Sequence, residues 1–186
     1  MHSFKGFTLI ELMVTIAVLA ILMAIAVPSF NDFFQRYRLR GAADDVATLL
    51  AVARTEAVAR NRNVAVVFSG AGAAWCVGAE GAAEPAAPGD LVVTAPSCNC
   101  SGDCTIGDRV MERRGAAYDG VTVAAIPAGF IFNRLTGAVN PLGMTTMTFQ
   151  SPNGTYSLAV NVSPLGRGRL CVPDDGSPSM SGFPKC

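Results

Sequence analysis

The chain has 186 residues, of which 51% are hydrophobic; this size and composition exclude a disordered protein and allow a single domain with a buried core. Its formal net charge is zero, which excludes binding to nucleic acid or anionic lipid through a strong overall field. Any charged partner must therefore be recognised by a local patch.

The first predicted element is an apolar run, Phe7 to Val27, in which Glu11 is the only charged residue. As a helix rising about 1.5 Å per residue, the run spans roughly 31 Å, the thickness of the hydrocarbon layer of a bilayer. It is longer than the apolar stretch of a secretory signal, so we assign residues 7–28 to a transmembrane helix. A carboxylate within a membrane usually marks function, and the only basic residue close to Glu11 is Lys5.

A longer motif surrounds this carboxylate. Gly6-Phe7-Thr8-Leu9-Ile10-Glu11 resembles the cleavage and methylation signal of type IV pilins and of the pseudopilins of type II secretion. The resemblance implies that a prepilin peptidase removes the leader, residues 1–6, by cutting after Gly6, and that the new terminus at Phe7 is N-methylated. It also implies that Glu11 meets the terminal amine of a neighbouring subunit during filament assembly. The alternative is an unprocessed membrane anchor with Glu11 near the lipid headgroups.

The same resemblance implies a location and a set of partners. A protein of this kind is a single-pass protein of the inner membrane with a periplasmic domain, and it later joins the pilus filament at the cell surface. Its expected partners are the inner membrane, the prepilin peptidase, other pilins and minor pilins.

Residues 29–62 are predicted to form an amphipathic helix. Apolar residues recur at steps of three and four, as one buried face of a helix requires, at Leu39, Ala42, Ala43, Val46, Leu49, Leu50, Ala53 and Ala57. Pairs at the i,i+4 spacing, such as Arg40 with Asp44, predict a solvated opposite face. Pro28 removes a helical hydrogen bond, so we expect a kink there or, alternatively, a helix break at the membrane exit.

Residues 63–186 are predicted to form a β-rich globular domain. Runs with a period of two predict strands at Val64–Ser69, Ala74–Val77, Leu91–Ala95, Val121–Ile126, Phe130–Asn133, Met144–Gln150 and Tyr156–Val162. The Ala-, Gly- and Pro-rich segment 78–89 is expected to be a surface loop. One long N-terminal helix packed on an antiparallel sheet is an α+β fold. This order of elements resembles the FimT and GspH branch of the type IV pilin-like family.

All the cysteines follow the apolar run, at Cys76, Cys98, Cys100, Cys104, Cys171 and Cys186. An even number in an exported segment predicts disulfides. We expect Cys171 to pair with Cys186, closing about 15 residues and contributing about 3 kcal/mol in the chain-entropy model. The other four are expected to tie the Cys76 strand to the loop of residues 98–104. The alternative, a zinc site at residues 98–104, lacks a second ligand pair, and the only histidine is His2 in the leader, so we expect no metal and no cofactor.

A local basic patch is predicted near the C-terminus. Arg167 and Arg169 lie in the stretch Ser163 to Cys171. If the segment is extended, side chains two residues apart project to the same side about 6.6 Å apart, a spacing comparable to that of adjacent phosphates. Gly166 and Gly168 leave no side chain beside the guanidiniums, so a phosphate backbone can approach closely. The two arginines are therefore candidates for clamping a nucleic-acid backbone.

Gly166-Arg167-Gly168-Arg169, followed by Leu and Cys, resembles the G-R-x-R motif of FimT-type minor pilins, which bind DNA during natural transformation. The resemblance implies that these four residues contact DNA. Such contacts to phosphates would be independent of base sequence. The alternative is that the two arginines are solvated or pair with Asp174 and Asp175.

The favoured function is a FimT-like minor type IV pilin that assembles into the pilus and binds extracellular DNA non-specifically for natural transformation. A GspH-like minor pseudopilin of the type II secretion system is the alternative, because it shares the leader, the helix and the sheet. An enzyme is disfavoured, because residues 7–186 contain no histidine, nucleophile elbow or phosphate-binding loop.

Overall fold

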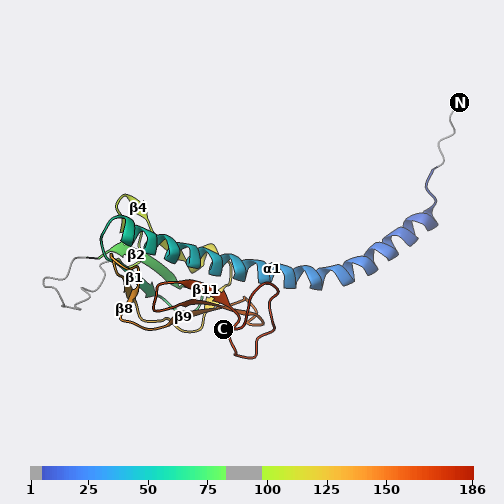
Figure 1. Cartoon of the computed structure of the whole chain (residues 1–186). Coiled ribbons are helices and arrows are strands. Elements are labelled where there is room, and N and C mark those ends of the chain that lie inside the picture. The colour runs from blue at the N-terminus through green and yellow to red at the C-terminus, as the bar shows by residue number, and fades with distance from the viewer. Residues whose placement is uncertain (1–5, 83–97) are drawn as a thin grey trace. The chain divides into compact units, whose positions relative to one another are not determined.

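The computed structural model describes residues 6–82 and 98–186, apart from the side chains of residues 27–29. The predicted strand Leu91–Ala95, residues 1–5 of the predicted leader and the end of the predicted 78–89 loop lie outside the described residues. The chain divides into two compact units, residues 1–35 and residues 36–186. Figure 1 shows the chain coloured from its N-terminus to its C-terminus.

Helix α1 (Leu9–Ala59) begins in the first unit and ends in the second. In the first unit its apolar side chains are exposed, and the helix is long and apolar enough, by length and composition, to cross a membrane. The helix does not end at Pro28, so the alternative of a helix break there is wrong. Its last residue lies three positions before the predicted end at residue 62.

In the second unit, one face of α1 is buried. All eight residues of the predicted apolar stripe are at most 2% exposed, which confirms the helical periodicity, namely Leu39, Ala42, Ala43, Val46, Leu49, Leu50, Ala53 and Ala57. They pack in one core with side chains of the strands, including Val66, Phe132, Phe149 and Leu158. Figure 1 shows this part of the helix lying along the strands. Burial of this stripe against the sheets holds the second unit together.

The strands of the second unit pair antiparallel throughout the described residues, which confirms the α+β fold. One sheet has the order β5 (Glu112–Arg114), β2 (Cys76–Gly81), β1 (Val64–Ser69), β7 (Phe130–Phe132) and β8 (Val139–Asn140). The other has the order β11 (Gly168–Cys171), β10 (Ser157–Val162), β9 (Thr145–Gln150) and β6 (Thr122–Val123). A small hairpin joins β3 (Thr105–Ile106) to β4 (Arg109–Val110), and a single 3₁₀ turn, η1, covers Gly115–Ala117.

The predicted strands Val64–Ser69, Met144–Gln150 and Tyr156–Val162 agree with β1, β9 and β10 to within one residue at each end, whereas two other predictions fail. The strand prediction Ala74–Val77 is misplaced, because β2 starts at Cys76 and continues to Gly81. The glycine-rich composition from Gly78 onward predicts a loop, but Gly78 to Gly81 belong to β2. A Cβ at Gly78 would lie 2.3 Å from Cys104 Sγ, so this strand needs a glycine where the disulfides pack on it. The prediction Val121–Ile126 shrinks to the two residues of β6.

Trp75 and Tyr118 link the segment around η1 to helix α1. Trp75 is buried, donates its indole N–H to Val121 O at 3.0 Å, and stacks on Tyr118 with ring centroids 5.5 Å apart. The Tyr118 hydroxyl donates to a carboxylate oxygen of Asp45 on α1 at 2.6 Å. Arg38 on the same helix forms an ion pair with Asp119 at 2.9 Å. The segment around η1 is thereby fastened to the helix by two polar contacts.

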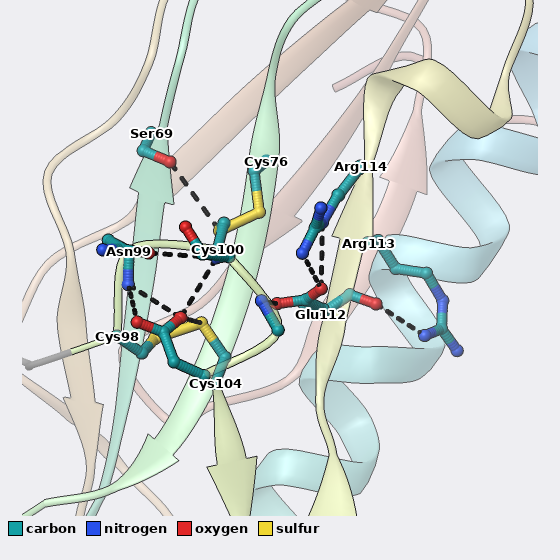
Figure 2. The surroundings of a disulfide bond; sticks show 12 residues. Ser69, Cys76, Cys98, Asn99, Cys100, Cys104, Glu112, Arg113 and Arg114 are labelled. Carbon is teal, nitrogen blue, oxygen red and sulfur yellow. Dashed lines mark hydrogen bonds and ion pairs between the residues drawn. A yellow bond between two sulfur atoms is a disulfide. The ribbon is translucent and has the colours of Figure 1, made fainter.

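The six cysteines form three disulfides, as shown for two of them in Figure 2. Cys171 is bonded to Cys186, as expected from the sequence. Cys76 is bonded to Cys100, which ties β2 to the following loop, and Cys98 to Cys104, within that loop. The four sulfurs near β2 belong to a separate buried cluster.

Candidate nucleic-acid interface

The predicted DNA motif lies at the turn of the β10–β11 hairpin. Asn161 pairs with Arg169 and Val162 with Gly168, so these two motif residues belong to β11. The turn is closed by hydrogen bonds from Gly166 N to Ser163 O at 2.8 Å and from Ser163 N to Arg167 O at 3.0 Å. The motif is therefore half turn and half strand rather than extended over its whole length.

The two glycines of the motif have different surroundings. Gly166 is buried, has a φ of 74°, and a Cβ there would lie 2.1 Å from Gly137 O. Only glycine fits both this left-handed backbone and this close approach. Gly168 is exposed, and nothing lies within 4 Å of the position of a Cβ. Open space beside the guanidiniums is thus found at Gly168, whereas Gly166 is needed by the turn itself.

A groove of about 720 Å³ lies between the last turns of α1 and this hairpin turn. We call it the arginine groove, and its lining residues are Ala51, Arg54, Thr55, Val58, Ala59, Gly166, Arg167, Gly168 and Arg169. The helix side is largely apolar, and three arginines contribute the charge. No carboxylate is among the lining residues. Because like charges gather there without compensation, the groove favours an anionic ligand.

Both motif arginines are exposed. Within residues 6–82 and 98–186, no carboxylate forms an ion pair with Arg167 or Arg169. The alternative pairing with Asp174 and Asp175 is not seen: Asp174 pairs with Lys185 at 3.4 Å, and Asp175 accepts a hydrogen bond from Ser177 N at 2.9 Å. Hydrogen bonds from Ser177 lower the pKa of Asp175, with further bonds adding to them and burial opposing them.

Arg54 was missed as a member of this group in the sequence. It is half-buried on α1, and its Nε donates a hydrogen bond to Gly137 O at 2.9 Å. The only indication in the sequence is that Arg54 directly follows Ala53, at the edge of the apolar stripe. A cation there is directed toward the packed face of the helix, but the sequence does not say which loop it meets.

Sequence reasoning also missed a second role for Glu11. Thr8 N and Thr8 Oγ1 donate to Glu11 Oε2 at 2.9 and 2.8 Å, and Glu11 N lies 3.3 Å from Thr8 Oγ1. This reciprocal pattern is a capping box, which satisfies otherwise unpaired N–H groups at the start of a helix. The signal was present as Thr8-Leu9-Ile10-Glu11. Gly6 and Phe7, the predicted cleavage point, lie just before the helix and are exposed.

The cysteine cluster does not offer the thiols that a zinc site would need. Asp103, Cys104 and Glu112 lie close enough to share an ion, but the Cys104 sulfur is bonded to Cys98. Burial opposes ionisation of Asp103, but the backbone N–H groups of Asn99 and Ser101 outweigh it and lower the pKa of this carboxyl. Glu112 accepts from Arg114 Nε at 2.9 Å (Figure 2). These carboxylates stabilise the loop.

Comparison with known families decides the class of the chain. The family model described as type II transport protein GspH matches residues 42–166, which is 125 of the 186 residues. The chain belongs to the GspH family. A second model, the prokaryotic N-terminal methylation motif, matches residues 1–27. The two matches confirm the predicted membership of the type IV pilin-like family, one in the apolar N-terminal run and the other in the globular domain.

Sequence relatives of this GspH-family chain match only part of it. A fimbrial protein of Pseudomonas aeruginosa is 42% identical over 55 residues, covering 30% of this chain and 36% of the relative. The type IV major alpha-pilin of Moraxella bovis is 43% identical over 47 residues, covering 25% and 30%. The chain thus spans about a third of the length of these relatives. The crystal structure of the type IV minor pilin FimU of P. aeruginosa has a TM-score of 0.49 and 18% identity, covering 74% of this chain and 91% of that one.

The GspH match stops at the first residue of the arginine motif. Gly166 is its last residue, and Arg167 to Arg169 lie beyond it. Arg167 and Arg169 therefore lie just outside the residues that the family model matches.

Proposed function

We propose that this GspH-family protein is a FimT-like minor type IV pilin that binds extracellular DNA through Gly166–Arg169 and serves natural transformation. The observation that carries this proposal is the arginine groove, where two exposed guanidiniums lie on one hairpin turn without a carboxylate partner among the described residues. Arginine suits this task because its planar, always charged fork can form bidentate bonds with phosphate. The role is structural and binding, not enzymatic.

The N-terminal part of the proposal concerns processing and assembly. A prepilin peptidase cuts after Gly6 and methylates Phe7, and the apolar part of α1 then anchors the protein in the inner membrane with its globular domain in the periplasm. On incorporation into the pilus, the Glu11 carboxylate pairs with the terminal amine of a neighbouring pilin. The exposed, non-helical position of Gly6 and Phe7 supports access by a peptidase.

Recognition in this proposal rests on phosphates. The groove presents guanidiniums and small apolar side chains, and it has no aromatic side chain on which a base could stack. Binding should therefore be independent of base sequence. It should weaken as salt rises, because the release of counterions from DNA is less favourable at a higher salt concentration. A few arginines bind DNA weakly, so several copies or neighbouring pilins would add avidity.

The test is a salt titration of binding to duplex DNA by the full-length protein in a non-ionic detergent. Wild type is compared with the double variant Arg167→Ala, Arg169→Ala and with Arg109→Ala, which removes one exposed arginine from the separate β3–β4 hairpin. We expect the double variant to lose most binding across unrelated sequences and Arg109→Ala to keep it. Wild type that fails to bind even at low salt would overturn DNA binding.

The GspH match itself favours a second candidate, a minor pseudopilin of the type II secretion system. Such a protein would share processing, anchoring and fold but would contact other pseudopilins or secreted proteins instead of DNA. Absence of DNA binding in wild type, together with co-purification of pseudopilins after cross-linking, would favour it. A strong preference for one base sequence would contradict the phosphate-clamp mechanism and require base contacts.

A further inference from the structure

We infer that Arg54 is a third phosphate-binding residue of the arginine groove. It belongs to helix α1 and not to the motif, and the inference rests on the proposed function. Arg54 lines the groove together with Arg167 and Arg169. It lies more than a hundred positions earlier in the chain, on α1, so no local motif includes it. The fold alone brings the three guanidiniums to one groove.

The Arg54 side chain is held by the turns on which the groove depends. Its Nε donates to Gly137 O at 2.9 Å, between β7 and β8. A Cβ at Gly137 would lie 2.9 Å from Arg54 Nε, and one at Gly166 would lie 3.0 Å from the same atom. Both glycines have a positive φ, so they combine a left-handed turn with the room that the arginine needs. Val139 N also donates to Pro164 O at 2.9 Å, which joins the two turns beside Arg54.

This arrangement leaves the charge of Arg54 available. Its Nε is hydrogen-bonded to Gly137 O, and across the described part of the chain no carboxylate forms an ion pair with the guanidinium. Its two terminal nitrogens can therefore donate to a ligand in the groove. Because the side chain is half-buried and fixed at Nε, it loses less conformational freedom on binding than the exposed Arg167 and Arg169.

With Arg54 included, both walls of the arginine groove carry positive charge, instead of the hairpin wall alone. The hairpin contributes Arg167 and Arg169, and the helix contributes Arg54 beside the apolar side chains of Ala51 and Val58. A nucleic-acid backbone lying in the groove would be gripped from both walls. The ligand class is a polyanion with regularly spaced phosphates, and free phosphate would engage only part of the set.

The experiment measures the slope of log affinity against log salt for full-length protein in non-ionic detergent. Each phosphate contact contributes about 0.9 to that slope for duplex DNA. We expect Arg54→Gln, which removes the charge, to make the slope shallower by about 0.9, and Arg54→Lys, which keeps the charge, to retain it. Arg109→Ala should leave the slope unchanged. A purely structural role for Arg54 would instead weaken both variants while leaving the slope as in wild type.

A second measurement uses the wild type and so does not depend on how the variants fold. Arginine-directed modification followed by mass spectrometry should show that duplex DNA protects Arg54, Arg167 and Arg169 but not Arg109. Protection of the motif arginines without Arg54, or an unchanged slope in Arg54→Gln, would overturn the role of Arg54 while leaving the proposed function intact. No salt-dependent binding by wild type would overturn the proposed function itself.

Discussion

The two parts of helix α1 use similar apolar residues in opposite ways. From Leu9 to Ile25, the large apolar side chains are more than half exposed, and none of them is in the core cluster. From Leu39 to Ala57, an apolar stripe of comparable residues is almost completely buried against the strands of its own unit. The second part is therefore stabilised within the chain, whereas the first part lacks such a partner among the described residues.

This difference teaches that hydrophobicity and stability are separate properties of the helix. Burying apolar surface stabilises a fold by roughly 25 cal/mol per Å², and the second unit gains that contribution from its own sheets. The first part gains no such contribution from the described residues. The membrane, before assembly, and neighbouring pilins, after it, are the partners that our proposal assigns. Changes in the two parts should consequently have different readouts.

The largest effect is expected at Glu11. Glu11→Gln keeps an oxygen that can accept the hydrogen bonds from Thr8 but removes the charge, so capping should survive while pairing with a neighbouring terminal amine is lost. We expect membrane levels and leader cleavage near those of wild type and almost no protein in sheared filaments, measured by immunoblot of both fractions. Thr8→Ala, which weakens the cap, serves as the control and should still assemble. Normal incorporation of Glu11→Gln would contradict the charge-pairing role.

The next largest effect is expected from a Leu→Ala substitution in the buried part of α1, compared with the same substitution in its exposed part. Leu49→Ala removes a side chain that is 2% exposed and should lower the free energy of unfolding of the globular unit by about 2–5 kcal/mol, the usual cost of such a cavity. Leu19→Ala removes a side chain that is 51% exposed and should leave that free energy unchanged. Denaturant titration followed by Trp75 fluorescence measures both. A comparable loss in Leu19→Ala would mean that the first part supports the globular unit.

The sequence predicted those features of the fold that depend on a local pattern of residues. The apolar stripe of α1 was visible from its steps of three and four, and the strands beginning at Val64 and Phe130 from their runs of branched and aromatic residues, although Val64, Ala65 and Val66 are all buried and do not alternate. The β5 strand, Glu112–Arg114, was missed because its charged residues show no alternation. Extension of β2 through Gly78 was hidden as well, because packing against Cys104 selects glycine there in spite of its low preference for strands.

The candidate site was predictable only in its local half. Arg167 and Arg169 form a readable motif, but the position of Arg54 depends on packing of the helix against turns more than eighty residues away. The role of Gly166 likewise follows from its contact with Gly137, which no local pattern reveals. The Thr8–Glu11 capping box, by contrast, is local and can be predicted from the sequence, because a Thr followed three residues later by a Glu is its usual pattern.

The smallest effect is a pH dependence confined to the second part. Burial, reinforced by the hydrogen bond to Asp45 and its charge, raises the pKa of Tyr118 above its ordinary value of about 10, and Arg113 opposes this only in part. Below pH 10 the tyrosine is neutral in both the folded and the unfolded chain, so its contribution is fully present.

Above pH 10 the unfolded chain releases this proton while the folded chain retains it, so stability falls as pH rises. A single proton sets a limit of about 1.4 kcal/mol per pH unit, and screening of this partly exposed hydroxyl reduces it. Tyr118→Phe should be less stable at neutral pH, having lost the bond to Asp45, but should lose less stability between pH 9 and 11, as measured by denaturant titration. An equal alkaline loss in wild type and variant would show that other groups control it. If the titration of Tyr118 controls the alkaline loss of stability, the contact between the segment around η1 and α1 weakens, while the exposed first part of the helix is unaffected.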